Sequence, residues 1–298
     1  MTLPHIAVCI CTFRRPELLR RLLRELDRQD TAGLFTFSII VVDNDAQLSG
    51  RSVVEEFAAR SRIAAHYYAE PRQNIALARN RTIENATGDY IAFLDDDEFP
   101  VPDWLQLLFA NCSRPRIAGV LGPVRPHFDT TPPRWLVAGR FCERPEHPTG
   151  TVMPGGKCRT GNVLFRREIL AGDPAPFRAE FGTGGEDVDF FQRMTQRGHV
   201  FVWCNEAIAY EVVPPSRWTR SFFLKRALLR GRNNLKLGHD RLRALMTSFV
   251  AVPAYSLLLP ATLFLGQHVF MKYGIKFCDH LGRVLALFRL NPIKERSM

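Results

Sequence analysis

The sequence predicts an α/β fold in which helices flank a mixed, mostly parallel sheet, with a helical segment following it. Strand-like apolar runs alternate with helical patterns through the first half of the 298 residues, which is the order typical of parallel sheets. Polar residues follow these strands at their carboxyl ends, where such sheets bind ligands. A long uncharged stretch near the C-terminus predicts further helices that associate with a membrane.

The first half of the chain is predicted to form four strands with three helices between them. The first helix begins at Pro16 and carries a row of leucines on one face. Because the strands are expected to run parallel, their carboxyl ends share one edge of the sheet, and Thr12, Asp43 and Asp95 all lie there. The predicted strands are residues 5–12, 37–43, 64–69 and 89–94, and the predicted helices are residues 16–29, 50–61 and 75–86.

Three consecutive aspartates end the fourth strand, in the run Phe93-Leu94-Asp95-Asp96-Asp97-Glu98. Carboxylates packed this closely repel one another, and the first and third can meet one hard cation through oxygen ligands. A Mg²⁺ or Mn²⁺ ion held there can bind a diphosphate and neutralise the charge that builds on a phosphate leaving group. The alternative is an acidic loop or the first turn of a helix, where Asp is also favourable.

The second half of the chain is less regular. Residues 123–156 are rich in Pro, Gly and Arg and predict a long loop over the site. A helix of about residues 186–197 follows a Gly-Gly pair, and strands are expected near residues 160–166, 200–203 and 207–212. Pro214-Pro215 ends this part, so we expect one domain over residues 1–216 and a second region over residues 217–298.

Charge and cysteine content restrict the class of protein. The net charge is +10, and it comes from residues 217–298, which carry 15 Lys and Arg against 3 Asp and Glu, whereas the rest of the chain is close to neutral. This asymmetry indicates an anionic surface as partner, and a membrane is favoured over nucleic acid because no helix-turn-helix, RNP or zinc-finger pattern is present. The seven scattered cysteines indicate core thiols in a reducing compartment, and no signal peptide is expected at the N-terminus.

The apolar segment near the C-terminus contains no Asp, Glu, Lys or Arg between Arg243 and Lys272. Ser248–Gly266 is long enough to span a bilayer, but Pro253 and Pro260 interrupt it and basic residues flank it on both sides. We therefore expect a kinked re-entrant or in-plane segment with both ends on the cytosolic side. The alternative is a buried helical hairpin of a soluble oligomer.

Five motifs at the predicted strand ends and helix starts occur in a familiar order: Ile10-Cys11-Thr12-Phe13-Arg14-Arg15, Val41-Val42-Asp43-Asn44-Asp45, Asn74-Ile75-Ala76-Leu77-Ala78-Arg79-Asn80, Asp95-Asp96-Asp97 and Gly185-Glu186-Asp187. With these motifs the chain resembles the family-2 glycosyltransferases of GT-A fold, which have a Rossmann-like sheet. It is particularly similar to bacterial exopolysaccharide enzymes of the succinoglycan glucosyltransferase type. The motif similarity covers residues 5–220, and the hydrophobic, basic tail also looks like that of this subgroup.

For the donor site, the resemblance implies nucleotide contacts from the strand ends. Asp43 would accept a hydrogen bond from a uracil ring, and Arg79 would contact the base or hold the carboxylates; the alternatives are a turn-forming Asp43 and a surface Arg79. Asp96 would bind the ribose hydroxyls. Asp97 would be the principal ligand of a divalent metal (Mg²⁺ or Mn²⁺), with Asp95 opening the D-x-D motif. The other implied donor-binding residues are Thr12, Phe13, Arg14, Asp45, Gly161 and Asn162.

For catalysis, the resemblance implies an inverting transfer in which a carboxylate removes the proton of the acceptor hydroxyl. Asp187 would be this base, and Glu186 would contact the acceptor or position Asp187; the alternative is an acidic first turn of a helix. Two departures from the family pattern are present. Glu211 stands where relatives often carry His, which leaves a further metal ligand open. Pro214 replaces the Gln of the Gln-x-x-Arg-Trp motif of processive members, so single addition is expected.

The sequence therefore predicts an inverting, metal-dependent, non-processive glycosyltransferase at the cytosolic face of the plasma membrane. It is expected to move a hexose from a nucleotide sugar, with UDP favoured, to a lipid-carried saccharide in cell-surface or exopolysaccharide biosynthesis. One alternative, a sugar-nucleotidyltransferase, would need a glycine-rich phosphate loop, which Thr12–Arg15 lacks. The other alternative, an inactive membrane-bound saccharide or nucleotide-sugar binding protein, would not need intact carboxylates at Asp95–Asp97.

Overall fold

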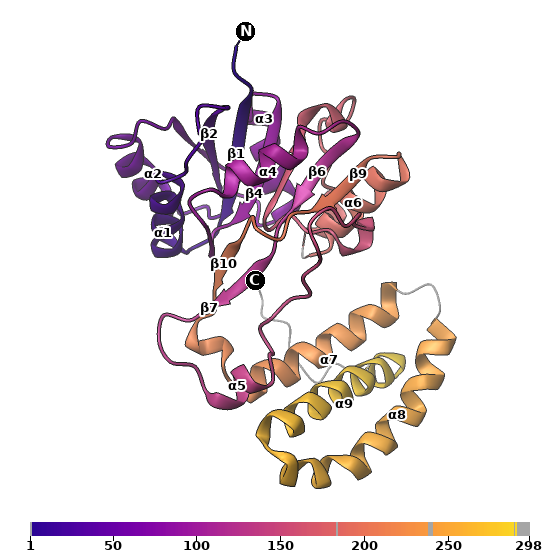
Figure 1. Ribbon diagram of the computed structural model, residues 1–298. Helices are drawn as coiled ribbons and strands as arrows, with labels where there is room; N and C mark the ends of the chain where they lie inside the picture. Colours follow the sequence, from indigo (N-terminus) through magenta and orange to yellow (C-terminus); the bar gives the residue numbers. More distant parts are fainter. Residues whose placement is uncertain (1, 183, 238–240, 289, 291–298) are drawn as a thin grey trace. The chain divides into compact units, whose positions relative to one another are not determined.

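The structure, a computed structural model, describes residues 2–182, 184–237, 241–288 and 290. It divides into two compact units (Figure 1), Met1–His127 with Arg144–Val212 and Phe128–Glu143 with Val213–Met298. The C-terminal part of the second unit begins at Val213, close to the residue 217 predicted for the second region. Each unit has its own hydrophobic core, so the two are described separately.

A large sheet forms the centre of the first unit. Its strands are β1 (His5–Thr12), β2 (Thr36–Asp43), β3 (Ala65–Ala69), β4 (Tyr90–Asp95), β6 (Ile117–Leu121), β8 (Val163–Arg166) and β9 (Val200–Trp203). The seven strands lie in the order β3-β2-β1-β4-β8-β6-β9. Neighbouring strands are parallel except where β8 runs antiparallel to β4 and β6. This arrangement confirms the predicted mixed, mostly parallel sheet.

Helices cover both faces of this sheet, as predicted. They are α1 (Pro16–Leu26), α2 (Arg51–Ala58), α3 (Ile75–Asn85), α4 (Trp104–Cys112) and α6 (Glu186–Gln196). Alternate residues of β1 show the division between the faces. Ile6 and Ile10 face the core shared with α1, α2 and α4, whereas Ala7 and Cys9 face the core shared with α3 and α6. Helix α4 is not among the predicted helices.

A second sheet of three strands has the order β5 (Glu98–Pro100), β10 (Ala209–Val212) and β7 (Val124–His127). The prediction of one long loop over residues 123–156 is therefore wrong at its start, where β7 pairs with β10. Pro126 conceals this strand in the sequence because proline cannot donate to a ladder, but an edge strand such as β7 tolerates that loss. Strand β10 also pairs with β5, and this register sets Glu211 opposite Glu98.

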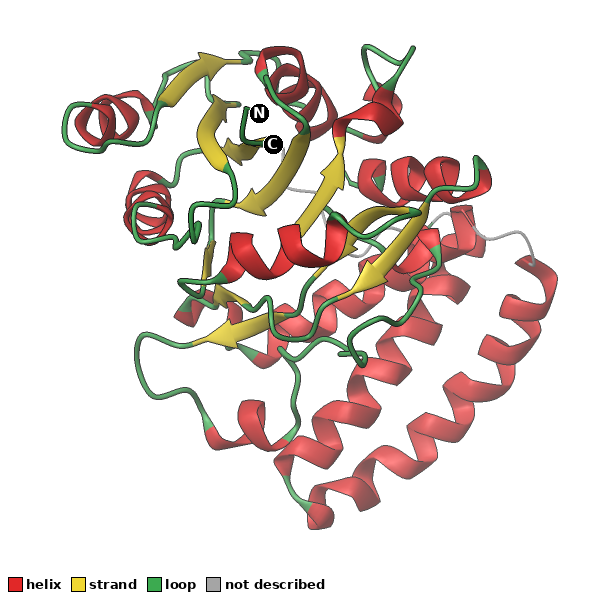
Figure 2. Ribbon diagram, turned by 45° about the horizontal axis from the view of Figure 1, so that its top comes forward, coloured by secondary structure: helices red, strands yellow, loops and turns green. Residues whose placement is uncertain are grey.

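The second unit consists mainly of helices (Figure 2): α5 (Arg134–Ala138), α7 (Arg220–Leu237), α8 (Arg241–Thr262) and α9 (Gln267–Leu287). Helices α7 and α9 approach closely because a glycine faces backbone at two points. A Cβ atom on Gly231 would lie 2.0 Å from the carbonyl oxygen of Asp279. A Cβ atom on Gly282 would lie 2.2 Å from the carbonyl oxygen of Leu228.

The segment Phe128–Glu143 belongs to this unit because α5 packs into its core. Leu136 of α5 lies in one cluster with Phe223 of α7 and Met271 of α9. The predicted first domain, residues 1–216, includes this segment, because no change of composition marks where the chain leaves the first unit or where it returns to it.

Helix α8 continues into a short 3₁₀ turn, and Arg241–Leu265 is long and apolar enough to cross a membrane by length and composition. Two prolines lie within α8 without ending it. The chain reverses at Gly266, whose φ of 108° favours glycine, and α9 returns along α8 with Tyr273 beside Tyr255. The re-entrant prediction and its soluble alternative both contain such a hairpin. Three basic residues that contribute to the predicted charge lie outside the described residues: Arg289, Lys294 and Arg296.

Candidate active site

Polar side chains gather where the parallel strands β1, β2 and β4 end. In the sheet register Thr12 lies opposite Asp43, and Cys11 lies opposite Asp95. The Thr12 hydroxyl donates a hydrogen bond of 2.9 Å to Oδ2 of Asp96. The structure therefore brings together the residues that the strand-end rule for parallel sheets predicts.

Arg15 links two of the aspartates, although no role is predicted for it. Its Nη1 atom donates to Oδ1 of Asp96 at 2.9 Å and to Oδ2 of Asp97 at 3.0 Å. Arg15 directly precedes α1, which begins at Pro16, and this turn brings its guanidinium to the acidic run. The available signal in the sequence is the second arginine of the pair Arg14-Arg15, immediately after a strand end.

Asp95 contacts another arginine, Arg79 of α3. Nη2 of Arg79 lies 3.4 Å from Oδ1 of Asp95, and Nη1 forms an ion pair with Oε1 of Glu186 at the start of α6. The side chains of Arg79 and Glu186 are only 8% and 5% exposed, so this pair is buried. Of the two roles implied for Arg79, holding the carboxylates is the one with contacts in the structure, and the alternative of a surface arginine is wrong.

Glu98 follows the aspartates and is buried beside them, although no role is predicted for it. Its Oε2 atom accepts a hydrogen bond of 3.1 Å from the backbone nitrogen of Asp95. Its Oε1 atom is buried and has no hydrogen-bond partner within the described part of the chain. Burial and the charge of Asp95 raise the pKa of Glu98 well above its usual value. A Cβ atom on Gly161 would lie 2.7 Å from this Oε1, so a larger residue there would displace the Glu98 carboxylate.

Glu211 joins the group from β10, where it lies opposite Glu98 and forms an ion pair with Arg144. Burial and the nearby carboxylates, Glu211 among them, raise the pKa of Asp97 to about 6. Glu211 is therefore close enough to act electrostatically on the residue implied as principal metal ligand.

The acidic cluster consists of Asp95, Asp96, Asp97, Glu98 and Glu211. In residues 2–182, 184–237, 241–288 and 290, no group of three or more His, Cys, Asp or Glu side chains is arranged to hold a metal ion. Mg²⁺, however, is usually held by one or two carboxylates together with substrate phosphates and water. The guanidinium between Asp96 and Asp97 shows that their oxygens already hold one cationic group. The residues thus fit an ion whose remaining ligands a diphosphate would supply, and the roles of Asp97 and Asp95 as its protein ligands stay predictions.

Other implied donor residues have partners within the protein. Asp43 is fully buried, and its Oδ2 atom accepts from the Gly50 nitrogen at 2.7 Å and from the Tyr67 hydroxyl at 3.0 Å. Nε of Arg14 lies 3.2 Å from Oδ1 of Asp45. The nucleotide-binding roles of these residues, and that of Phe13 beneath the Arg14 guanidinium, stay predictions.

Asn162 lies in the core, next to Gly161. Its side-chain nitrogen donates to the carbonyl oxygens of Pro123 and Ala207, each at 2.8 Å. Its side-chain oxygen accepts from Nε1 of Trp104 at 2.7 Å. These bonds use both N–H groups of the Asn162 side chain within the protein. A contact between Asn162 and the sugar donor stays a prediction, and it would need the backbone of Asn162.

Asp187 lies in the first turn of α6, after Gly185, whose φ is 101°. Its Oδ1 atom accepts from the Val188 nitrogen at 2.7 Å, and its Oδ2 atom lies 3.8 Å from Nε of Arg159. The Asp187 side chain is 16% exposed, against 5% for Glu186. Asp187 is therefore the more exposed carboxylate of the pair, and Glu186 is the one that holds the buried arginine.

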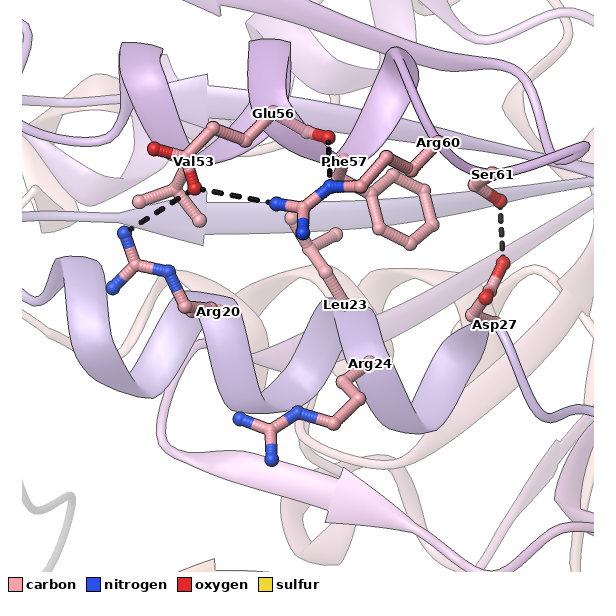
Figure 3. Close-up of a pocket in the computed structure, with 9 residues that line it drawn as sticks. All are labelled: Arg20, Leu23, Arg24, Asp27, Val53, Glu56, Phe57, Arg60 and Ser61. Carbon is pink, nitrogen blue, oxygen red and sulfur yellow. Dashed lines mark hydrogen bonds and ion pairs between the residues drawn. The ribbon is translucent and has the colours of Figure 1, made fainter.

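A surface groove of about 420 Å³ lies between α1 and α2 (Figure 3) and contains none of the predicted site residues. The Glu56 carboxylate lies between Arg20 and Arg60, with nitrogen–oxygen distances of 3.7 Å and 3.5 Å. Because these charged groups pair with one another, we assign the groove no part in the site.

Known proteins share both sequence and fold with this chain. A sequence model described as Glycosyl transferase family 2 matches residues 7–171, which include the acidic run but not Asp187. The chain is 38% identical over 237 residues to the succinoglycan biosynthesis protein ExoM of Rhizobium meliloti (strain 1021), covering 78% of this chain and 75% of that protein. It is 25% identical over 219 residues to the glycosyltransferase AglE of Haloferax volcanii, covering 72% of this chain and 69% of that protein.

Two solved structures resemble the fold. Mannosyltransferase PcManGT from Pyrobaculum calidifontis, in complex with GDP-Man and Mn²⁺, matches with a TM-score of 0.64 and 16% identity, covering 98% of this chain and 89% of that one. TarS 1–349 of S. aureus, in complex with UDP-GlcNAc, matches with a TM-score of 0.55 and 15% identity, covering 82% and 69%. At such identities the likeness concerns the fold alone, and it confirms the predicted GT-A fold.

Proposed function

This chain belongs to glycosyl transferase family 2 and is a glycosyltransferase, and on that premise we propose that it moves a hexose from a nucleotide sugar to a lipid-carried saccharide. The observation that carries the proposal is the acidic cluster at the ends of β1 and β4, where Thr12 and Arg15 hold Asp96. Hydroxyl, guanidinium and carboxylate groups at one sheet edge suit the phosphates and sugar hydroxyls of such a donor.

The donor proposed is a nucleoside-diphosphate hexose, with UDP favoured, bound with a divalent cation. The ligands named for PcManGT and TarS, GDP-Man with Mn²⁺ and UDP-GlcNAc, support a donor of this class. We assign Asp97 and Asp95 as the protein ligands of a Mg²⁺ or Mn²⁺ ion, which when bound would neutralise charge on the leaving diphosphate. Asp96 is assigned to the ribose hydroxyls.

Asp187 is the proposed catalytic base. As a bond forms between the acceptor oxygen and the anomeric carbon, the Asp187 carboxylate accepts the hydroxyl proton. The nucleoside diphosphate leaves from the opposite face of the sugar, which inverts the anomeric configuration. Glu186 takes the positioning role, because its carboxylate is used in the ion pair with Arg79.

The acceptor is proposed to be carried by a lipid in the cytosolic face of the plasma membrane. The name of ExoM supports a role in exopolysaccharide biosynthesis. In the second unit, Leu257 of α8 is 82% exposed and Phe264 of the following 3₁₀ turn is 92% exposed, and Arg241 and Arg243 lie at the start of α8. An exposed apolar segment beside basic residues suits a bilayer that contains anionic lipids. We propose that the α8–α9 hairpin enters this bilayer from one side and that each cycle adds one sugar.

Titration calorimetry of the detergent-solubilised protein tests the donor site. UDP, UDP-glucose, UDP-galactose, GDP-mannose and dTDP sugars are titrated in Mn²⁺ and in EDTA. We expect metal-dependent binding of one nucleotide class, lost in Asp97→Ala and retained in Asp103→Ala, which removes an exposed aspartate of the same unit. Folded wild-type protein that binds none of them would contradict the proposal and favour an inactive membrane-bound protein.

A further inference from the structure

Arg15 bridges two carboxylates of the acidic cluster, one of which, Asp97, is a proposed metal ligand. One atom, Nη1, is 2.9 Å from Oδ1 of Asp96 and 3.0 Å from Oδ2 of Asp97. Both aspartates are buried, whereas the Arg15 side chain is 42% exposed. Arg15 therefore reaches the cluster from the solvent side, and its guanidinium can leave without repacking the core.

The arginines around the cluster are held in different ways. Arg79 is buried and pairs with Glu186 inside the protein, so it is fixed by the fold. Arg144 pairs with Glu211 on β10. Arg15, by contrast, contacts Asp97 directly. Arg15 contacts one oxygen of Asp97, and its charge repels a divalent ion bound to the same carboxylate, so the present position of Arg15 opposes metal binding at Asp97.

We propose that Arg15 is a counter-ion which a divalent cation displaces from Asp97, and that the freed guanidinium then binds the diphosphate of the donor. This inference rests on the function proposed above. A guanidinium presents a planar fork of N–H donors that matches phosphate oxygens. Arg15 is also the residue before the first turn of α1, an 11-residue helix whose N-terminal amides add partial positive charge. Arg15 thus couples metal binding to binding of the diphosphate.

Binding of Mn²⁺ alone, without nucleotide, separates this role from a merely structural one. In Arg15→Gln the competing charge is gone, so Mn²⁺ should bind roughly tenfold more tightly than to wild type. The same variant should bind UDP roughly tenfold more weakly at saturating Mn²⁺, because a charge-assisted phosphate contact is lost. If Arg15 had only a structural role, its replacement would instead weaken binding of both Mn²⁺ and UDP, or of neither.

Two further variants complete the experiment. Arg20→Gln removes an arginine of α1 that pairs with Glu17 and Glu56 on the surface, and we expect both affinities to equal those of wild type. Arg15→Lys keeps the charge but loses the planar fork, so Mn²⁺ affinity should stay at the wild-type value while UDP binds more weakly. This variant keeps the proposal falsifiable if Arg15→Gln does not fold.

The possible results distinguish this proposal from the function on which it rests. If wild type binds UDP with Mn²⁺ but folded Arg15→Gln binds Mn²⁺ no more tightly, the counter-ion role is overturned and the donor site stands. Unchanged UDP affinity in both Arg15 variants overturns the diphosphate contact. If neither wild type nor Arg15→Gln binds Mn²⁺ with or without UDP, both the counter-ion role and the proposed metal site are overturned.

Discussion

Arg79 and Glu186 form an ion pair inside the first unit that joins α3 to the first turn of α6. The same guanidinium lies 3.4 Å from Asp95, so one arginine connects the strand that carries the acidic run with the helix that carries Asp187. Because Arg79 is buried and bonded on both sides, it fixes the spacing between the proposed metal ligand and the proposed base.

Breaking this ion pair from one side should destabilise the protein. Arg79→Met leaves the Glu186 carboxylate buried without its partner, and we expect a loss of roughly 3–5 kcal/mol in the free energy of unfolding, measured in urea. The double variant Arg79→Met with Glu186→Met should lose much less than the sum of the single variants, since the buried Glu186 charge is gone and Asp95, which also loses Arg79, is 45% exposed. Additive losses in this cycle would show that the two side chains are not coupled.

Removing the Asp187 carboxylate should stop turnover without loss of the donor. In Asp187→Asn we expect kcat to fall roughly 10²- to 10⁴-fold, the usual contribution of a general base, while calorimetry finds unchanged UDP affinity. Asp189→Asn is the matched control, because Asp189 pairs with Arg193 within α6 and should leave kcat near wild type. Equal losses in the two variants would contradict the assignment of the base.

Much of the fold follows from local patterns in the sequence. Strands β1, β2 and β4 are largely apolar runs that end in polar residues, so their positions and shared edge are predictable from the sequence pattern. Strand β7 is not, because its four residues include Pro126 and it is defined by pairing with β10, which lies far along the chain. The membership of Phe128–Glu143 in the second unit is likewise a long-range effect, set by Leu136.

The residues of the candidate site likewise divide into those that local sequence patterns predict and those that they do not. Residues that end strands, such as Thr12 and Asp95, converge because the sheet topology requires it. The contacts of Arg15 and Glu98 depend on the direction that each side chain takes from a turn, and no periodic pattern encodes that direction. Asn162 shows a different case: its motif predicts a contact with the sugar donor, which stays a prediction, whereas the buried hydrogen bonds of its amide leave no signal in the sequence.

Loss of the Asn162 amide should therefore lower stability more than donor affinity. Asn162→Ala leaves the Trp104 indole and two backbone carbonyls without their partner, and we expect a loss of roughly 2–4 kcal/mol in the free energy of unfolding. Asn205→Ala is the control, since it removes a 3.3 Å bond from the Trp203 indole at a partly exposed position. A stable Asn162→Ala protein that no longer binds UDP would instead support the predicted donor contact.

The tip of the α8–α9 hairpin should govern attachment to membranes. Phe264 is 92% exposed in the turn that ends α8, so Phe264→Asp should leave helix content and melting temperature unchanged. Binding to vesicles of phosphatidylethanolamine and phosphatidylglycerol should weaken at least tenfold, because burial of one Phe contributes roughly 1.5–3 kcal/mol. Val152→Asp is the control: Val152 is 64% exposed in the first unit, and its replacement should not alter sedimentation with vesicles. If Phe264→Asp cosediments as wild type does, the hairpin does not enter the bilayer at its tip, and the soluble helical pair becomes the better description of α8 and α9.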